Sequence, residues 1–388
     1  MNERHFGMDW LRIGAFALLI LYHSGMAFVP WDWHVKASHT VIFASVPMNA
    51  LNAWRLGLLF VVSGYASAAL IARTGGGRGF AWSRTKRLMV PTLVAMAVVI
   101  PPQPWVELMV KHGYAQSYFY FWSRDYFRFG AIDGIDVPTW QHLWFVVYLW
   151  VYSLALVGLR GLIGTGRRAA LLGMVERTLS GWRLLAIPIG LLLLRAWLVR
   201  SGETHDLFTD VAAHSLYPGM FLFGIALHSS PRLRGEVASA LRPAAILAIG
   251  AYAVVAAIDI HWPGDAVPPE PFTALFRSAH AVQCWATIVA LVAVAVRYWN
   301  RDHRWRPMLS EAVFPFYIVH QTIIVLVVWS MRPLDLGAGS AFAITVIATA
   351  AGCWAFYLTG RSIGTIRPLI GLNRVERTRV PAREAVTA

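Results

Sequence analysis

Long apolar runs recur from one end of this chain to the other, and they limit its fold more than any other feature. A run of about 18 or more apolar residues is long enough for a helix that crosses a hydrocarbon core of roughly 30 Å. The sequence therefore predicts an all-α, polytopic membrane helix bundle with about ten transmembrane helices. The ten runs cover residues 8–29, 47–72, 88–105, 141–163, 184–199, 211–227, 243–260, 274–298, 312–331 and 338–359.

The composition supports a membrane protein. Hydrophobic residues make up 57% of the chain and charged residues only 14%, whereas about 25% charged residues is usual in soluble domains. The two cysteines, Cys284 and Cys353, both lie inside apolar runs. We therefore expect neither a disulfide framework nor a cysteine-rich metal site, and no other metal site is predicted.

The distribution of basic residues predicts how the helices are oriented. The formal net charge is +14, which by itself would also suit a nucleic-acid-binding protein. When the ten spans alternate from a cytoplasmic N-terminus, 24 Lys and Arg residues fall on the cytoplasmic side and only six on the opposite side. This is the positive-inside pattern, with both termini cytoplasmic, so we expect no nucleic-acid partner. A bacterial inner membrane is the simplest location.

The chain is expected to form one membrane domain followed by a short tail. No linker rich in Pro, Gly or Ser separates a soluble module, and no internal repeat stands out. Residues 1–360 are therefore assigned to the integral membrane domain and residues 361–388 to a basic cytoplasmic tail. The first apolar run is too long for a signal-peptide core, so we expect it to remain as an anchor.

Four arginines lie within or at the edges of the predicted spans and require an explanation. They are Arg12, Arg55, Arg195 and Arg277. An ionisable group at membrane depth is costly to bury, and its default interpretation is a functional one.

Arg12 and His23 stand out because the first apolar run contains both. The step of eleven positions from Arg12 to His23 advances an α-helix by about 16 Å and turns it only about 20° beyond three full revolutions, so both side chains share one face. Histidine also titrates near neutral pH, which suits proton transfer. The pattern predicts a cation near one membrane surface and a proton-transfer group deeper in the bilayer. The structural alternative is a histidine that only hydrogen-bonds to a neighbouring helix.

Other polar and aromatic residues point to a cavity near His23. Three histidines lie at the outer-to-middle depth of separate spans, and two tryptophans and two histidines in PWDWHVKASH lie just above His23. Taken singly, each of these residues is more often a hydrogen-bonding or packing residue between helices. The residues that we assign to substrate binding are Trp33, His142, Trp144, Tyr317 and His320.

Two further segments carry residues suited to binding. In RTGGGRGFAWSRTKRLMVP, a glycine run precedes Arg84, Lys86 and Arg87, so backbone donors and cations can converge on a phosphate. Positive-inside topology would supply these basic residues in any case. The longest outer stretch, residues 106–140, is rich in aromatic residues. We expect it to form an interfacial helix, a lid over a sugar, or, for most of these residues, an aromatic belt.

Five motifs in order along the ten spans make the chain resemble the acyltransferase-3 family of integral membrane acyltransferases, and most closely its glucan biosynthesis protein C group. The resemblance covers nearly the whole chain. WHVKAS at residues 33–38 is similar to the narrower group. The five motifs are Arg12 and His23 with ten residues between them, FVVSGY at 60–65, RTKRLMVP at 84–91, HLWFV at 142–146 and YIVHQ at 317–321.

The resemblance implies an enzyme that moves an acyl group from cytoplasmic acyl-CoA to a hydroxyl of a periplasmic or extracellular glycan. It implies that His23 is the essential catalytic residue, that Arg12 is its essential partner, and that the basic segment with Arg84, Lys86 and Arg87 serves the CoA phosphates. In the glucan group the acyl group is succinyl, and acetyl is the other candidate here. The implied partners are acyl-CoA, a glycan acceptor and membrane lipid, with no permanently bound cofactor.

The chemistry leaves two mechanisms and two competing functions open. His23 can act as a general base on a sugar hydroxyl, or it can form an acyl-histidine intermediate. Arg12, about 16 Å along the helix from His23, is better placed to hold the donor than to touch His23. A secondary transporter or a glycan flippase is the main alternative, although no matching pair of interrupted spans is found. A purely structural role as a scaffold protein would not explain why Arg12 and His23 are buried in a span.

Overall fold

The computed structural model describes residues 5–74 and 76–374, and its long elements are all α-helices. Helices cover all ten apolar runs, so the predicted polytopic helical bundle is confirmed. The main helices of these runs are α1 (Phe6–Met26), α3 (Arg55–Thr74), α4 (Gly77–Val98), α7 (Trp144–Leu162), α9 (Arg183–Leu198), α11 (Tyr217–Ser229), α13 (Leu241–His261), α14 (Glu270–Tyr298), α15 (Arg306–Met331) and α16 (Ala338–Ser362).

The shorter elements connect these helices. A two-stranded antiparallel sheet pairs β1 (Gly130–Ile132) with β2 (Ile135–Val137). The short helices and turns are α2 (Ser45–Asn52), α5 (Pro102–His112), α6 (Tyr118–Tyr120), α8 (Thr165–Thr178), α10 (Val211–His214), α12 (Pro231–Ser239), the 3-10 turns η1 (Ile42–Ala44), η3 (Gln141–Leu143), η4 (Arg332–Leu334) and η5 (Arg367–Ile370), and the π-helical turn η2 (Phe121–Asp125).

Length and composition identify most of the membrane spans. Within the described residues, seven helices are long and apolar enough to cross a membrane, and the number reaches nine when each of two bent helix pairs counts as one span. α1 is not among them, because Asp9, Arg12 and His23 interrupt its apolar sequence. Its 21 residues still extend about 31 Å, which is enough to cross the hydrocarbon core. With α1 included, the number agrees with the sequence prediction.

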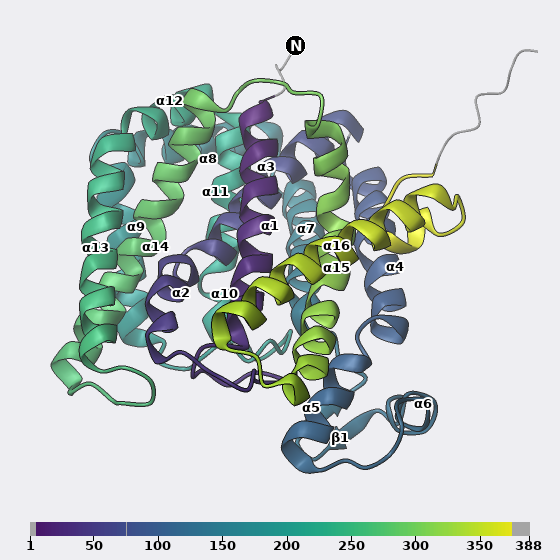
Figure 1. Cartoon of the computed structure of the whole chain (residues 1–388). Helices are drawn as coiled ribbons and strands as arrows, with labels where there is room; N and C mark the ends of the chain where they lie inside the picture. Colours follow the sequence, from purple (N-terminus) through teal and green to yellow (C-terminus); the bar gives the residue numbers. More distant parts are fainter. Residues whose placement is uncertain (1–4, 75, 375–388) are drawn as a thin grey trace, which may run out of the picture.

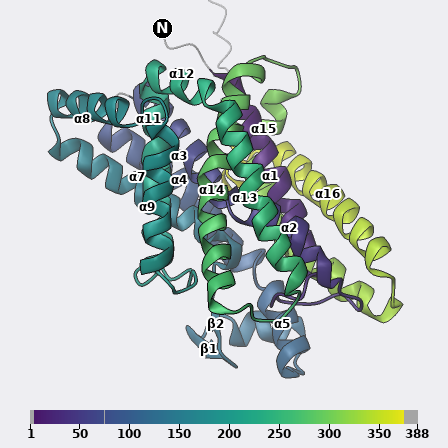
Figure 2. The ribbon, with the colours of Figure 1, turned by 90° about the vertical axis from the view of Figure 1, so that its left-hand side faces the viewer.

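α1 runs through the middle of the bundle. Figure 1 shows it passing from the end that holds the N-terminus to the end that holds α5 and β1. It contacts α3, α14, α15 and α16. Figure 2 shows α16 on one side of the bundle and α8 and α9 on the other. We call the end with the N-terminus the inner end and the end with β1 and β2 the outer end. The polar residues of α1 are therefore enclosed by neighbouring helices.

Small residues allow the closest helix contact in the bundle. A Cβ atom at Gly64 of α3 would lie 2.0 Å from the Phe221 carbonyl oxygen, and one at Gly224 of α11 would lie 1.9 Å from the Val61 carbonyl oxygen. No side chain fits at either position. This contact between α3 and α11 fixes one wall of the inner cavity described below.

The chain remains packed on the bundle after residue 360. Arg367 of η5 forms an ion pair with Glu311 at 3.0 Å, and Ile370 is buried against the end of α16. Residues 361–374 of the predicted tail therefore lie against α15 and α16. The rest of that tail, residues 375–388, lies outside the described residues.

Candidate active site

Two cavities lie along α1, one toward each end of the bundle. The inner cavity, of about 440 Å³, is lined by Arg12 together with side chains from α3, α4, α7 and α15. The outer cavity, of about 680 Å³, is lined by His23 together with side chains from the outer connections. Arg12 and His23 share a helix face, but each opens into a different cavity.

His23 lies at the end of a hydrogen-bonded chain. Its Nδ1 is 2.7 Å from Nε2 of His320, and Nδ1 of His320 is 2.8 Å from the carbonyl oxygen of Tyr317. Because a carbonyl oxygen only accepts, Nδ1 of His320 carries the proton, and Nε2 of a neutral His320 accepts from Nδ1 of His23. A neutral His23 then has an unprotonated Nε2, which is the form that a general base requires.

His142 and Tyr317 hold each other in place across two helices. Nε2 of His142 donates to the carbonyl oxygens of Tyr317 and Ile318, at 3.0 and 3.3 Å. The Tyr317 hydroxyl donates in return to the His142 carbonyl oxygen. These bonds connect the start of α7 to the middle of α15. Since the Tyr317 carbonyl also accepts from His320, the same contacts fix the chain that orients His23.

The structure brings most of the predicted substrate-binding residues to one place. Trp33, His142, Trp144 and Tyr317 all line the outer cavity with His23. His320 is fully buried and lies behind His23, where it orients the catalytic candidate without lining the cavity. The ring of Trp144 stacks on His205 with 4.5 Å between centroids, so one of its two faces is already covered.

The inner cavity is strongly cationic. Arg84 donates to the Ser67 hydroxyl at 2.6 Å, and its buried Nε has no hydrogen-bond partner among the described residues. Among the described residues, Asp9 is the one carboxylate in the lining, and it forms an ion pair with Arg306 at 2.8 Å. Converging guanidinium groups are the usual means of binding phosphate. The arginines that line this cavity are Arg12, Arg73, Arg84 and Arg87.

The basic segment differs from the sequence prediction in two respects. α4 begins at Gly77, so the three cations lie on a helix and not on a glycine loop with converging backbone donors. One residue advances a helix by about 100°, so Arg84 and Arg87 share a face while Lys86 points elsewhere. Lys86 is exposed, lies over the ring of Trp82 at 4.5 Å and does not line the cavity. Arg73, which the sequence analysis did not single out, lines it instead.

An aromatic wall separates the two cavities. Tyr317 and Phe145 line both of them, and their ring centroids are 6.1 Å apart. Phe16 lines the inner cavity and meets Tyr317 edge-on at 5.5 Å. We call these three side chains, which lie at the boundary of the two cavities, the aromatic wall.

A polar network holds Trp33 above His23. His34 donates from Nδ1 to Glu107 and accepts from the Gln321 amide at Nε2. Lys111 joins Glu107 to Asp32, with both ion pairs at 2.8 Å. The network ties the segment that carries Trp33 to α5 and α15. The sequence analysis noted the two histidines of this segment but did not identify their partners, because those partners lie more than 70 positions away in the chain.

Lys36 closes the outer end of α1. Its Nζ donates to the carbonyl oxygens of Met26 and Val29, both at 2.8 Å, which satisfies groups that the end of a helix leaves unpaired. The pKa of Lys36 is lowered from 10.5 to about 8, mainly because the side chain is partly buried; Asp32 opposes this shift and Lys111 adds to it.

This shift predicts a pH-dependent contribution to stability. Between about pH 8 and pH 10.5, the unfolded chain keeps a proton on Lys36 that the folded protein has lost. The contribution of Lys36 to the free energy of unfolding therefore rises with pH across that window. We expect the melting temperature of the wild type in detergent to rise relative to Lys36→Met as the pH increases from 8 to 10.5. A constant difference would contradict the assignment, and Lys86→Met, at an exposed lysine, is the matched control.

Two features bear on metals and thiols. Across residues 5–74 and 76–374, no group of three or more His, Cys, Asp or Glu side chains is arranged to hold a metal ion. Cys284 and Cys353 are both buried free thiols.

Comparison with known proteins identifies the class to which this protein belongs. A family model described as an acyltransferase domain matches residues 5–358, which is nearly the whole chain, so the protein is a membrane acyltransferase. More narrowly, the chain belongs to the acyltransferase-3 family. The expected family is thereby confirmed.

Curated relatives are similar over a smaller part of the chain. Glucans biosynthesis protein C of Escherichia coli O6:K15:H31 (strain 536 / UPEC) is 26% identical over 155 residues, which are 39% of this chain and 37% of that protein. The protein of the same name from Escherichia coli (strain K12) is 25% identical over the same length. The aligned part thus covers little more than a third of these relatives. No solved structure matches.

Proposed function

We propose that the protein is an O-acyltransferase that takes an acetyl or succinyl group from acyl-CoA at the inner cavity and transfers it to a glycan hydroxyl at the outer cavity. The observation that carries the proposal is the pair of cavities on one face of α1, with arginines at one end and His23 at the other. The relatives named for glucan biosynthesis support a glucan as the acceptor. We assign the protein to a bacterial inner membrane, and the positive-inside pattern supports an orientation with the inner end in the cytoplasm.

The proposed donor site uses the inner arginines. CoA carries its phosphates at one end and its thioester at the other, joined by the long, flexible pantetheine arm. Arg12, Arg84 and Arg87 hold the phosphates by charge-assisted hydrogen bonds. The distance of about 16 Å along α1 from Arg12 to His23 lets the arm extend past the aromatic wall while the phosphates remain bound.

The proposed reaction needs one base at one atom. Nε2 of His23 accepts the proton of the sugar hydroxyl as the oxygen attacks the thioester carbonyl. The carbon–sulfur bond breaks, and the departing sulfur of CoA takes the proton from the imidazolium. His320 stabilises that imidazolium because its Nε2 accepts from Nδ1 of His23. The cavity also raises the reaction rate because it holds both reactants close together with their reacting atoms aligned.

A vesicle assay tests this proposal directly. The purified protein is reconstituted into vesicles loaded with a β-glucan oligosaccharide, and acyl-CoA with a labelled acyl group is added outside. We expect labelled oligosaccharide inside the vesicles and free CoA in the outer medium, in amounts that depend on the protein. Mass spectrometry of the oligosaccharide distinguishes acetyl from succinyl. Movement of unmodified oligosaccharide across the membrane, without acylation, would instead indicate a transporter.

A further inference from the structure

A third cavity, of about 470 Å³, lies beside the outer cavity and contains no part of the proposed reaction centre. The ends of α3, α9, α11 and α14 enclose it. It shares Arg55, Leu56 and Glu203 with the outer cavity, so the two spaces adjoin. A ligand in this third cavity would therefore reach the surroundings of His23 without crossing the bundle.

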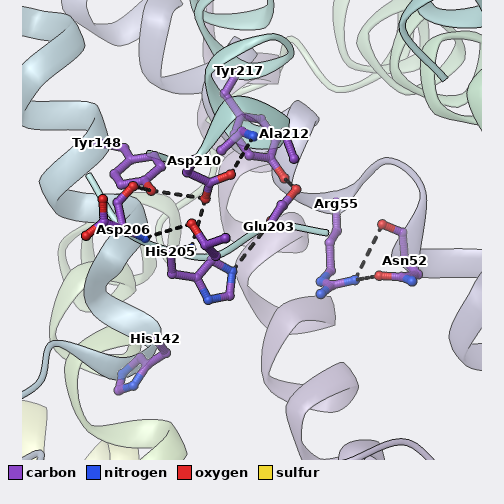
Figure 3. A network of polar contacts seen from close by, with 12 residues as sticks. Asn52, Arg55, His142, Tyr148, Glu203, His205, Asp206, Asp210, Ala212 and Tyr217 are labelled. Atoms are coloured by element: carbon purple, nitrogen blue, oxygen red, sulfur yellow. Dashed lines mark hydrogen bonds and ion pairs between the residues drawn. The ribbon is translucent and has the colours of Figure 1, made fainter. Parts of the chain in front are cut away.

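The third cavity carries an excess of positive charge. Within the described part of the chain, four arginines line it and Glu203 is the one carboxylate in its lining. Glu203 accepts from the Tyr217 hydroxyl and lies 3.6 Å from Nε2 of His205, so its oxygens are directed to neighbours other than the arginines. Figure 3 shows this arrangement, with Arg55 directed toward Asn52. The four arginines are Arg55, Arg195, Arg200 and Arg277.

Three of these arginines have no carboxylate partner among the described residues. Arg55 donates to the side chain of Asn52 at 2.5 Å and lies 3.4 Å above the ring of Tyr22, and its buried Nε has no hydrogen-bond partner. Arg195 donates only to neutral groups, the Ser215 hydroxyl and a backbone carbonyl. Arg277 lines the cavity and forms no ion pair with the described part of the chain.

These contacts orient the guanidinium groups without neutralising them. The three arginines without a carboxylate partner are half-buried, and a charge that is partly withdrawn from water at membrane depth is costly unless an opposite charge compensates it. The four arginines come from three helices and the connection after α9, so positive-inside topology, which would place basic residues at the inner end, does not account for them. The missing negative charge is best supplied by a ligand.

We infer that the third cavity binds an anionic group, phosphate or carboxylate, carried by the glycan acceptor. The inference rests on the proposed function and names the class of its acceptor. Arginine guanidinium groups suit both anions because they donate paired hydrogen bonds to two oxygens. Arg55 stands between the third and outer cavities, so the bound anion would hold a neighbouring sugar at the outer cavity, with a hydroxyl toward His23.

Sugar titrations test the cavity independently of catalysis. The protein in a neutral detergent is titrated with glucose 6-phosphate, glucuronate and glucose by calorimetry. We expect both anionic sugars to bind about tenfold more tightly than glucose. Arg277→Gln should remove most of this preference, and Arg277→Lys should keep part of it because the charge remains. Arg332→Gln, at an outer-end arginine that does not line the cavity, is the matched control and should retain the preference. Equal binding of the three sugars to the wild type would overturn the inference.

Two further measurements separate the inference from the proposed function and from lipid binding. In the vesicle assay, an oligosaccharide with a terminal phosphate should be acylated about tenfold faster than its neutral equivalent. Equal use of both would overturn the inference but not the proposed function, whereas no transfer to either would contradict the proposed function. As a control for folding, the affinity of Arg277→Gln for acyl-CoA is measured, and it should equal that of the wild type. If phosphatidylglycerol in nanodiscs abolishes the preference for anionic sugars, the occupant is a lipid head group and the acceptor assignment fails.

Discussion

A His23→Ala variant is expected to lose acyl transfer by about 10²- to 10⁴-fold, the usual contribution of a general acid–base group. The reason is the unprotonated Nε2 that the chain of His320 and the Tyr317 carbonyl leaves facing the outer cavity. Without it, the nearest unprotonated nitrogen is Nε2 of His320, which is fully buried and does not line the cavity. The measurement is the initial rate of labelled acyl transfer in vesicles that contain equal amounts of inserted protein.

Two comparisons make the His23 result specific. His39→Ala removes a half-exposed histidine of the outer connection that pairs with Asp335 and does not line the cavity, so it should retain the wild-type rate. The two mechanisms are distinguished by incubating the protein with labelled acyl-CoA in the absence of an acceptor. A label that stays on His23 would show an acyl-histidine intermediate. Full activity in a well-inserted His23→Ala protein would rule out either role.

The second large effect is expected at the donor site. Arg87→Gln should raise the KM for acyl-CoA by about 10- to 100-fold, because a hydrogen bond between charged groups contributes roughly 1.5–3 kcal/mol. Arg87 lines the inner cavity on the same face of α4 as Arg84. The kcat at saturating donor should change much less, since the thioester still reaches His23. Steady-state kinetics with varied acyl-CoA measures both quantities.

Lys86→Gln is a matched control for Arg87→Gln. It removes a positive charge from the neighbouring position of the same helix, but its side chain lies over Trp82 and away from the cavity. We expect its KM for acyl-CoA to stay within about twofold of the wild type, because its ammonium group does not line the cavity and acts only through solvent, where salt screens its charge. An equal increase in both variants would mean that general electrostatic attraction, and not a built site, sets donor affinity.

The membrane bundle could be predicted from the sequence because its signal is local. Each span is a continuous apolar run, and α1 keeps Arg12 and His23 on one face by helix geometry alone. The same local reasoning placed Trp33, His142, Trp144 and Tyr317 near His23, and all four line its cavity. Their roles in binding remain predictions.

Contacts between distant segments could not be predicted in this way. His23 and His320 are 297 positions apart, and nothing in either segment shows which atoms face each other. Lys86 was grouped with Arg84 and Arg87 because the glycine run was interpreted as a loop, whereas α4 already begins at Gly77. The sequence singled out Arg55, Arg195 and Arg277 as costly, but only the packing of α3, α9 and α14 shows that one cavity contains all three.

The aromatic wall bears on how the membrane stays sealed during the proposed reaction. Phe16, Phe145 and Tyr317 place aromatic rings at the boundary of the two cavities, and such rings oppose the passage of water and small ions. Under the proposed function only the acyl end of the donor passes this point. The nucleotide part of CoA then stays on the inner side, where CoA can receive another acyl group. Protons do not leak through the protein, so the proton gradient across the membrane is preserved. A cell could thus modify polymers beyond its permeability barrier with carbon from its own metabolism.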